Sequence, residues 1–257
     1  MIVIARSRRR RGNLVFAFTG IGAPVSSCLQ SRLLRYARND NEIAMTQEIL
    51  TIDVREPNPN DIDKVVDYLN NGEVIAYPTE TIYGLGADVL NRKAVKRIFD
   101  LKARDYGLPI SILVADLDMM REYVDHVPDE IIPLLRRFWP GPLTMLFPAS
   151  SSFPKGLITN TGKVGIRISS NPIASAIVRK FGKPITTTSA NLSDFPASLN
   201  VKHIKKYFGE KIPCIVDGGE CEPSRGSTVV DVGAETMRII REGVIPADDV
   251  IKCFQNS

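Results

Sequence analysis

Residues 77–104 bring hydroxyl groups and cations together in one stretch of the chain. Thr81 follows a short apolar run that ends at Pro78, and Lys102 and Arg104 close the stretch. Paired Lys and Arg side chains suit an anionic ligand such as a phosphate or a carboxylate. The same pair could also be a solvated helix end, because cations are favoured there. Spacing alone therefore allows either an anion site or a charged helix terminus.

A second group of polar side chains lies at the end of a Thr-rich run. Thr187 is followed by Ser189 and Asn191, whose hydroxyl and amide groups can donate hydrogen bonds to phosphate oxygens. By themselves these residues are also typical of a strand that turns into a loop. The same two interpretations apply to Ser227 and Arg241, which stand near the ends of other apolar runs.

The sequence lacks the short motifs that most often bind nucleotides or metals. There is no P-loop pattern, and Gly84-x-Gly86 lacks the third glycine of a dinucleotide fingerprint, so a nucleotide would need another cradle. The cysteines show no CxxC spacing, which argues against a zinc site or a disulfide framework. With two histidines, a His-rich metal site is not indicated. No apolar run approaches the roughly 18 residues that a membrane span needs.

Alternating strands and helices must position these side chains. Their order predicts an α/β fold, a twisted mixed open sheet with flanking helices in a single domain. Ligands of open α/β sheets bind outside the carboxyl ends of strands, where we expect Thr81, with Gly84 and Gly86 letting a ligand approach the backbone. We expect strands at residues 49–54, 74–77, 109–114, 143–147, 164–168, 185–190, 214–216, 227–232 and 237–241.

Cap residues and prolines place the helices between these strands. We expect a helix capped by Asn60 or Asp61, a helix capped by Asn91, helical stretches around 116–124 and 129–138, and helices at 172–181, 200–208 and from 246 onwards. Asp129 is the expected cap of the second helical stretch. Residues 150–162 are typical of a surface loop. Thr144 follows Pro-Gly-Pro at 140–142 and is most simply part of a turn into a strand.

Composition and charge describe an ordinary globular chain with an unusual start. The 257 residues are 44% hydrophobic and 24% charged, and the net charge is +4. Residues 1–44 hold eight arginines and two acidic residues, so they carry +6 and the remainder carries −2. The near-neutral remainder gives no general argument for nucleic-acid binding. We predict that 1–44 is a basic extension outside the fold, with Met45 as the native start and 45–257 as the catalytic domain. A secretory signal is the alternative, although its apolar patch is short.

Several motifs, taken together, resemble one family. They are YPTETIYGLGAD (77–88), the Lys-x-Arg pair in LKARDYGLP, WPGPLT (139–144), VGIRI followed by Asn171-Pro172, TTSANLS (187–193), STVVDV (227–232) and REGVI (241–245). In this order they resemble the YrdC-like family of L-threonylcarbamoyladenylate synthases, in its short TsaC-type form. The resemblance covers nearly all of residues 46–245.

The resemblance implies a nucleotidyltransferase reaction. L-threonine, bicarbonate and ATP would give threonylcarbamoyl-AMP and pyrophosphate, with Mg²⁺ accompanying ATP and no dedicated metal site. The threonylcarbamoyl group would then pass through downstream tRNA-modification transferase proteins to the adenosine beside the anticodon. An RNA contact is a further partner that the family allows. The implied location is the cytoplasm, without a membrane.

The resemblance also implies roles for individual residues. Threonine would be held by Thr81, Thr187 and Ser227. Lys102 and Arg104 would be catalytic and face the carboxylate and the triphosphate. The ATP side would be formed by Arg104, Thr144, Ser189, Asn191 and Arg241, and Arg167 would support either ligand.

This sequence departs from many relatives at Leu108, Leu113 and Ala197, where polar residues are more usual. These departures leave open how that side of the pocket meets ATP and threonine. Two other functions stay open. One is a carbamoyl-adenylating enzyme, like the related domains of hydrogenase-maturation proteins. The other is a binder of double-stranded RNA that acts in ribosome assembly. The sequence does not assign a general base or an oligomeric state.

Overall fold

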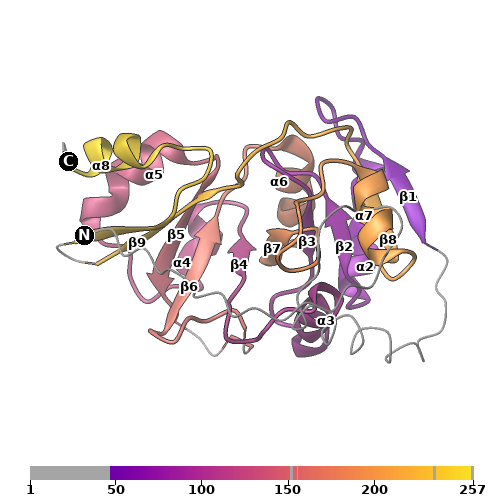
Figure 1. Ribbon diagram of the computed structural model, residues 1–257, viewed down its shortest axis with the longest axis horizontal. Coiled ribbons are helices and arrows are strands. Elements are labelled where there is room, and N and C mark those ends of the chain that lie inside the picture. Colours follow the sequence, from indigo (N-terminus) through magenta and orange to yellow (C-terminus); the bar gives the residue numbers. More distant parts are fainter. Residues whose placement is uncertain (1–46, 151–152, 155, 234–235, 256–257) are drawn as a thin grey trace, which may run out of the picture. The chain divides into compact units, whose positions relative to one another are not determined.

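A computed structural model describes residues 47–150, 153–154, 156–233 and 236–255. In this part of the chain, ten strands form one sheet in the order β1-β8-β2-β3-β7-β4-β6-β5-β9-β10 (Figure 1). The strands are β1 (Glu48–Thr51), β2 (Ile75–Tyr77), β3 (Gly84–Gly86), β4 (Ser111–Leu113), β5 (Leu143–Pro148), β6 (Lys163–Arg167), β7 (Ile185–Ser189), β8 (Cys214–Asp217), β9 (Thr228–Val232) and β10 (Met237–Arg241). The chain divides into the units Met1–Asp40 and Asn41–Ser257, and the first lies wholly outside the described residues. The prediction of an extension at 1–44 therefore stays a prediction.

The sheet is mixed, which confirms the predicted fold class. β8 pairs in parallel with β1 and β2, β4 with β6, and β5 with β9, whereas the remaining neighbours are antiparallel. Each predicted strand is present, with ends shifted by a few residues at most. Strands from distant parts of the sequence thus lie side by side, such as β7 between β3 and β4 (Figure 1).

The short strand β3 was not expected. Its two glycines lie inside the sheet, and a Cβ atom on Gly86 would stand 2.9 Å from the ring of Tyr77. Gly84 and Gly86 therefore make room for a buried aromatic ring on the neighbouring strand. Strand pairing and side-chain packing thus use the space beside these glycines, and the prediction that they let a ligand approach the backbone stays a prediction.

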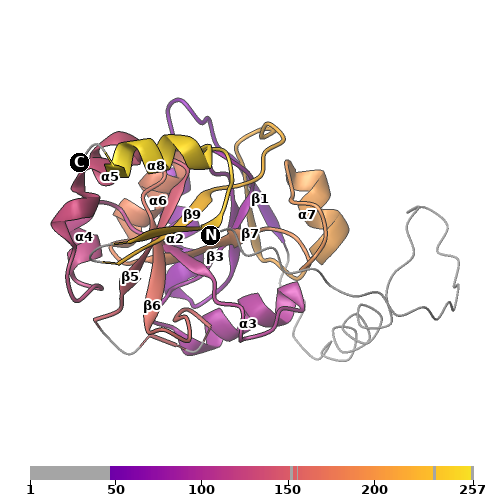
Figure 2. The ribbon, with the colours of Figure 1, turned by 60° about the vertical axis from the view of Figure 1, so that its left-hand side comes forward.

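Eight helices cover the sheet in the described residues. They are α2 (Pro59–Asn70), α3 (Arg92–Lys102), α4 (Leu117–Arg121), the 3₁₀ helix η1 (Asp129–Ile131), α5 (Ile132–Phe138), α6 (Pro172–Phe181), α7 (Val201–Phe208) and α8 (Ala247–Gln255). α2 packs against α6, and α5 lies beside α8 in both ribbon views (Figures 1 and 2). The apolar faces of α2 and α6 bury Val65 and Ile177 in one core cluster with Val216 of the sheet.

Two of the predicted caps were wrong. The side chain of Asn58 caps α2 by accepting from the backbone N–H of Asn60 at 2.9 Å, and Pro59 takes the first helical position. Neither Asn60 nor Asp61 is the cap, since Pro59 has no N–H to lose and already starts the helix. Asp129 lies inside η1, which has no side-chain cap. The caps predicted for the helices at 92 and 201 are confirmed.

The segment 150–162 is more buried than a surface loop. Among its described residues, Phe153 and Leu157 belong to the core, and Gly156 accepts a hydrogen bond from the backbone N–H of Ile110 at 2.8 Å. Gly156 has φ of +95°, and a Cβ atom there would meet the ring of Phe99. The segment therefore packs over α3, so this part of the prediction was wrong. In the described residues, no helix combines the length and apolar character that crossing a bilayer requires.

Candidate active site

The end of α3 is fixed to the end of β7 by Lys102. α3 begins at Asn91, whose side chain accepts from two backbone N–H groups, and it ends at Ala103 in the left-handed conformation. Lys102 is 1% exposed, and its ammonium donates to the carbonyl oxygen of Ser189, the carbonyl oxygen of Asn191 (2.8 Å) and Oδ1 of Asn191 (3.2 Å). The alternative of a solvated helix end is wrong, because this cation is enclosed by acceptors from another strand.

Burial makes the charge of Lys102 costly. It lowers the pKa of Lys102 from 10.5 to about 7, and the positive charge of Arg104 acts in the same direction. The three acceptors match the three N–H bonds of the ammonium form. The side chain thus holds residues 189–191 in place. Ser189 contributes its carbonyl oxygen to this network, and no hydrogen bond of its hydroxyl is part of it.

A second group joins β5, β9 and β10. The hydroxyls of Thr144 and Ser227 share a hydrogen bond of 2.9 Å, and both residues are buried. Arg241 donates through Nη2 to the carbonyl oxygen of Ser227 at 2.9 Å and to its hydroxyl at 3.2 Å. The structure therefore brings these three predicted residues together, although they come from three strands.

The chain after β10 is folded tightly against the start of β9. The backbone N–H of Gly243 donates to Oγ1 of Thr228 at 2.9 Å, and this hydroxyl donates to the carbonyl oxygen of Ile245. A Cβ atom on Gly243 would lie 2.3 Å from the carbonyl oxygen of Gly226 and 2.4 Å from the carbonyl carbon of Ser227. Only glycine fits this crossing, which holds Arg241 over Ser227.

A third group surrounds Glu80, a residue to which the sequence gave no role. Oε2 of Glu80 accepts from the hydroxyl of Ser169 and from Nη2 of Arg167 at 3.4 Å. Arg167 is 4% exposed. The charges of Arg167 and Glu80 both act on the hydroxyl of the neighbouring Tyr77. Burial raises the pKa of Tyr77 to about 12, and the hydroxyl of Thr187 is among its neighbours. The pattern Thr-Glu-Thr after a strand was a signal for Glu80, but a lone glutamate is most often solvated.

Thr81 is attached to the segment that leads into β9. Its hydroxyl shares a hydrogen bond of 3.0 Å with that of Thr79, and its carbonyl oxygen accepts from the hydroxyl of Ser224 at 3.2 Å. A Cβ atom on Gly226 would touch both Ile82 and the guanidinium of Arg241. Thr81 is thus connected to the Ser227 group through residues 224–226, without a direct hydrogen bond to Ser227.

Three guanidinium groups link the clusters. Burial lowers the pKa of Arg104, and the positive charge of Arg241 lowers it further. Burial and then the positive charge of Arg167 lower the pKa of Arg241. These cations are close enough to repel one another. In the described residues Arg104 and Arg241 donate to carbonyl oxygens rather than pairing with carboxylates. Such an arrangement favours a ligand with several negative charges.

The residues that depart from the resemblance lie in two different environments. Leu113 is fully buried in the core, whereas Leu108 is 52% exposed. The backbone of Leu108 takes part in the site, because its carbonyl oxygen accepts from Nε of Arg104 at 2.8 Å. At position 108 the side chain is therefore free to differ while its backbone still holds Arg104.

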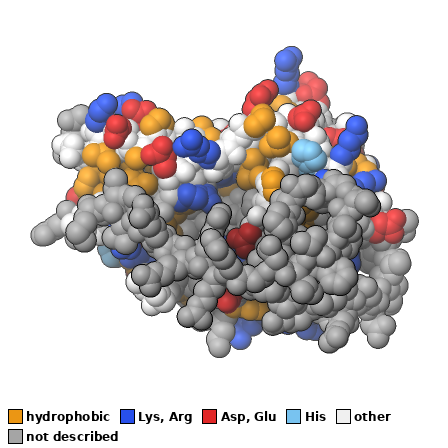
Figure 3. All heavy atoms as spheres, in the orientation of Figure 1, with side chains coloured by type: hydrophobic (Ala, Val, Ile, Leu, Met, Phe, Trp, Pro, Cys, Tyr) orange, Lys and Arg blue, Asp and Glu red, His pale blue; other side chains and the backbone are white. Residues whose placement is uncertain are grey.

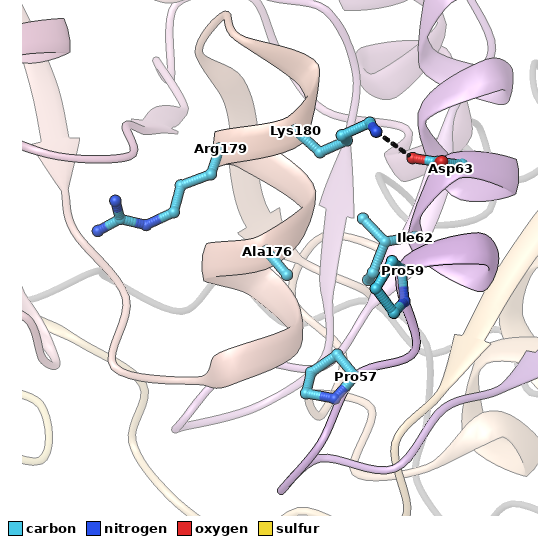
Figure 4. Close-up of a pocket in the computed structure, with 7 residues that line it drawn as sticks. All are labelled: Pro57, Pro59, Ile62, Asp63, Ala176, Arg179 and Lys180. Atoms are coloured by element: carbon cyan, nitrogen blue, oxygen red, sulfur yellow. Dashed lines mark ion pairs between the residues drawn. The ribbon is translucent and has the colours of Figure 1, made fainter.

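Cavities elsewhere do not coincide with these groups. One of about 360 Å³ lies between α2 and α6 and is lined by Pro57, Pro59, Ile62, Asp63, Ala176, Arg179 and Lys180 (Figure 4). None of these seven is a candidate site residue. In the described part of the chain no three His, Cys, Asp or Glu side chains converge as metal ligands. Cys214 and Cys221 are free thiols.

These observations define a class of protein. A mixed α/β sheet brings together cations, hydroxyls and the carboxylate of Glu80 from distant segments of the chain. The chain belongs to the Sua5/YciO/YrdC family, whose profile is described as "Telomere recombination" and matches residues 67–243. The fold and the family thus agree with the resemblance seen in the motifs.

Curated relatives and solved structures share most of the chain. The threonylcarbamoyl-AMP synthase of Pyrococcus abyssi (strain GE5 / Orsay) is 36% identical over 185 residues, which cover 72% of this chain and 54% of that protein. A threonylcarbamoyl-AMP synthase of Vibrio parahaemolyticus is 31% identical over 186 residues and is covered completely, together with 72% of this chain. The crystal structure of P. abyssi Sua5 complexed with L-threonine superposes with a TM-score of 0.76 at 33% identity, over 80% of this chain and 61% of that one.

Proposed function

We propose that this protein is an L-threonylcarbamoyladenylate synthase, a nucleotidyltransferase that makes threonylcarbamoyl-AMP and pyrophosphate from L-threonine, bicarbonate and ATP. The chain spans 54% of the length of the Pyrococcus relative, so the proposed activity depends on the residues of the site itself. The observation that carries it is a cluster of four cations set beside hydroxyl groups: Lys102 and Arg167 are buried, Arg104 is half-buried and Arg241 is exposed. Relatives named for this activity and a neighbour bound to L-threonine support the same assignment.

The chemistry needs positioning and charge stabilisation more than covalent catalysis. The amino group of threonine forms a carbamate with bicarbonate, and a carbamate oxygen then attacks the α-phosphorus of ATP and expels pyrophosphate. Arg104 and Arg241 would stabilise the charge on the phosphate oxygens. Burial of these cations strengthens that effect, because a low local dielectric increases every charge interaction. Excluding water also protects the carbamate.

Each predicted residue has a proposed place in this reaction. Lys102 holds the 189–191 segment, which places Ser189 and Asn191 at the α-phosphate. The amide of Asn191 already accepts from Lys102 and donates to the carbonyl oxygen of Phe195, so in this proposal its side chain fixes the segment. Thr81, Thr187 and Ser227 hold threonine. Thr144 and Arg241 line the nucleotide side. Arg167 supports the bound threonine. Mg²⁺ would accompany ATP through phosphate oxygens and water, which suits the described part of the chain, where no three metal-ligating side chains converge.

The wider setting is also a proposal. The product would pass to tRNA-modification transferase proteins in the cytoplasm, and residues 45–257 would carry the whole reaction. On the face in Figure 3, Lys and Arg side chains of the described residues are interspersed with acidic and hydrophobic ones. We favour an enzyme over a binder of double-stranded RNA because residues 45–257 carry a net charge of −2, which gives no general argument for nucleic-acid binding.

The test is the release of pyrophosphate by the purified full chain. With ATP, bicarbonate and L-threonine, the wild type should release pyrophosphate, and omission of threonine should abolish the release. Arg104→Ala and Lys102→Ala should each lower kcat/KM by about 10²–10³-fold, as loss of a transition-state donor does. Lys64→Ala is the matched control, because Lys64 is an exposed lysine on α2 and should retain full activity.

Equal release without threonine would refute the substrate assignment. Release that depends on carbamoyl phosphate in place of threonine would point to a carbamoyl-adenylating enzyme instead. Retention of full activity by both variants would refute the role of the cation cluster.

A further inference from the structure

Glu80 and Arg167 form a buried ion pair in which each side chain has one polar atom without a partner. Oε2 of Glu80 accepts from Ser169 and from Nη2 of Arg167. In the described residues, Oε1 of Glu80 and Nε of Arg167 are buried and make no hydrogen bond. Buried polar atoms are nearly always satisfied, so two such atoms in one pair indicate that something else completes them.

The pair lies inside the site. Glu80 directly precedes Thr81, and Tyr77 feels the charges of both Arg167 and Glu80 as well as the hydroxyl of Thr187. On the other side, the charge of Arg167 reaches Arg241. The Glu80–Arg167 pair is therefore adjacent to Thr81 in the chain and within electrostatic reach of Tyr77 and Arg241.

The atoms specify the chemistry of their ligand. A carboxylate oxygen can only accept, and it prefers a charged donor such as an ammonium group. Nε of a guanidinium can only donate, and it prefers an anionic oxygen. A ligand that satisfies both has a cationic amine and an anionic oxygen close together, which is the arrangement of an amino acid beside bicarbonate.

Other groups do not fit this role. The amine of Lys102 already has three acceptors in the described residues, two of them backbone carbonyl oxygens and the third Oδ1 of Asn191, so it is committed to the 189–191 segment. Asp63 also has a buried oxygen without a hydrogen bond, but it lies at the cavity between α2 and α6 and forms an ion pair of 2.8 Å with Lys180 (Figure 4).

We propose that Glu80 binds the α-ammonium group of the amino-acid substrate through Oε1 and then accepts its proton. This proposal rests on the proposed function. Proton transfer to Oε1 leaves a neutral amine whose lone pair attacks the carbon of bicarbonate. The N–C bond forms, the C–OH bond breaks, and the hydroxide leaves with the second proton of the nitrogen as water. The carbamate anion that results is stabilised by Nε of Arg167.

The first experiment measures what Glu80 recognises. Isothermal calorimetry compares L-threonine with (2S,3R)-2,3-dihydroxybutanoate, in which a hydroxyl replaces the ammonium group. The wild type should prefer threonine, and Glu80→Gln should reduce this preference by about 10- to 100-fold, because the charged acceptor is lost. Ser169→Ala is the matched control, since it removes the other donor to Glu80 but keeps the carboxylate, and it should keep the preference.

The second experiment separates proton transfer from positioning. Glu80→Gln should lower kcat for threonine-dependent pyrophosphate release by about 10²–10⁴-fold, beyond its effect on the KM for threonine. Glu80→Ala leaves space beside Arg167, and added formate should restore part of its kcat. A purely structural carboxylate would not respond to formate in this way.

Several outcomes would overturn the proposal. These are an unchanged preference in Glu80→Gln, an unchanged kcat in that variant, or a Glu80→Ala enzyme that formate leaves unaffected. If Glu80→Gln does not fold, Glu80→Asp decides, because it keeps the charge and must keep the preference for the ammonium compound. Failure of the proposed function is distinguishable, since the wild type would then release no threonine-dependent pyrophosphate.

Discussion

Replacement of Lys102 by methionine tests the buried amine directly. The unfolded chain titrates this lysine near 10.5, whereas burial lowers the pKa in the folded protein to about 7. Between these two values the unfolded state binds more protons than the folded state, so this group makes the free energy of unfolding rise as pH increases. Below pH 7 both states are protonated, and the full cost of the buried charge is present.

The pKa gap sets the size of the effect. Since each pKa unit corresponds to about 1.4 kcal/mol, the shift from 10.5 to about 7 predicts a gain of about 3–4 kcal/mol between pH 7 and pH 10. Because Lys102 is 1% exposed, solvent screening does not reduce this figure. Methionine has a similar length and does not titrate. As the pH rises from 7 to 10, the free energy of unfolding of the wild type should therefore increase by that amount relative to that of Lys102→Met.

Urea unfolding at pH 7, 8, 9 and 10 measures the difference in free energy of unfolding between the two proteins. The contributions of other titrating groups are the same in both proteins and cancel in this difference. Lys64→Met is the control, because a hydrogen bond and the charge of Asp61 raise the pKa of Lys64, so its effect has the opposite sign. Parallel curves for the wild type and Lys102→Met from pH 7 to pH 10 would refute the reasoning, since they would mean that the amine is not desolvated.

Two further substitutions test how the site is built. Gly243→Ala places a Cβ atom 2.3 Å from the carbonyl oxygen of Gly226 and should lower the free energy of unfolding, measured with urea, by about 3 kcal/mol or more. Gly107→Ala is the control and should cost far less, because its Cβ atom meets only a flexible side chain. Equal losses in the two variants would contradict the tight crossing at Gly243. Ser227→Ala removes the hydrogen-bond partner of the Thr144 hydroxyl, and Thr144→Val leaves the Ser227 hydroxyl only its bond from Arg241. Each should cost about 1–3 kcal/mol, and the double variant should cost less than their sum; strict additivity would show that the shared hydrogen bond contributes nothing.

Local signals explain why α6 could be predicted with the correct ends. Asn171 caps it, Pro172 occupies the first helical position, and Gly182 ends it in the left-handed conformation. Each of the three signals acts within one helical turn of its own residue, so the helix ends can be predicted without knowledge of distant contacts. The strands at 185–189 and 237–241 could be predicted from apolar runs for the same reason.

Long-range packing explains what the sequence could not show. β3 forms because Leu85 pairs with Ala76 on one side and with Thr188 on the other. A strand of only three residues is too short to show an alternating hydrophobic pattern in the sequence. Phe153 and Leu157 were placed in a surface loop because the surrounding serines and glycines are typical of loops. Phe153 packs against Tyr123, and Gly156 lies against Phe99 of α3, so the segment is covered by residues far away in the sequence.

The same distinction holds for the site. Residue types and motif order could identify Lys102 and Arg104 as anion-binding candidates, but not that Lys102 is satisfied by carbonyl oxygens 87 and 89 residues away. Glu80 was missed because its burial depends on Arg167, 87 residues further along the chain. A carboxylate acquires such an environment only when β6 folds against the 79–83 segment.

Carbonyl oxygens, rather than carboxylates, hold most of the cations of this site, and that choice has a consequence for binding. A carbonyl satisfies the hydrogen-bond donors of Arg104 and Arg241 without cancelling their charge. The repulsion between neighbouring guanidiniums is therefore already present in the folded protein, where it lowers their pKa. A polyanion relieves this repulsion when it binds, whereas a carboxylate partner would first have to be displaced. The charge of Asp194 offsets part of this effect at Arg104. The carboxylate of Glu80 pairs through a single oxygen, which keeps its other oxygen available for a cationic group. The site thus combines a surplus of positive charge for phosphates with one acceptor for an amine.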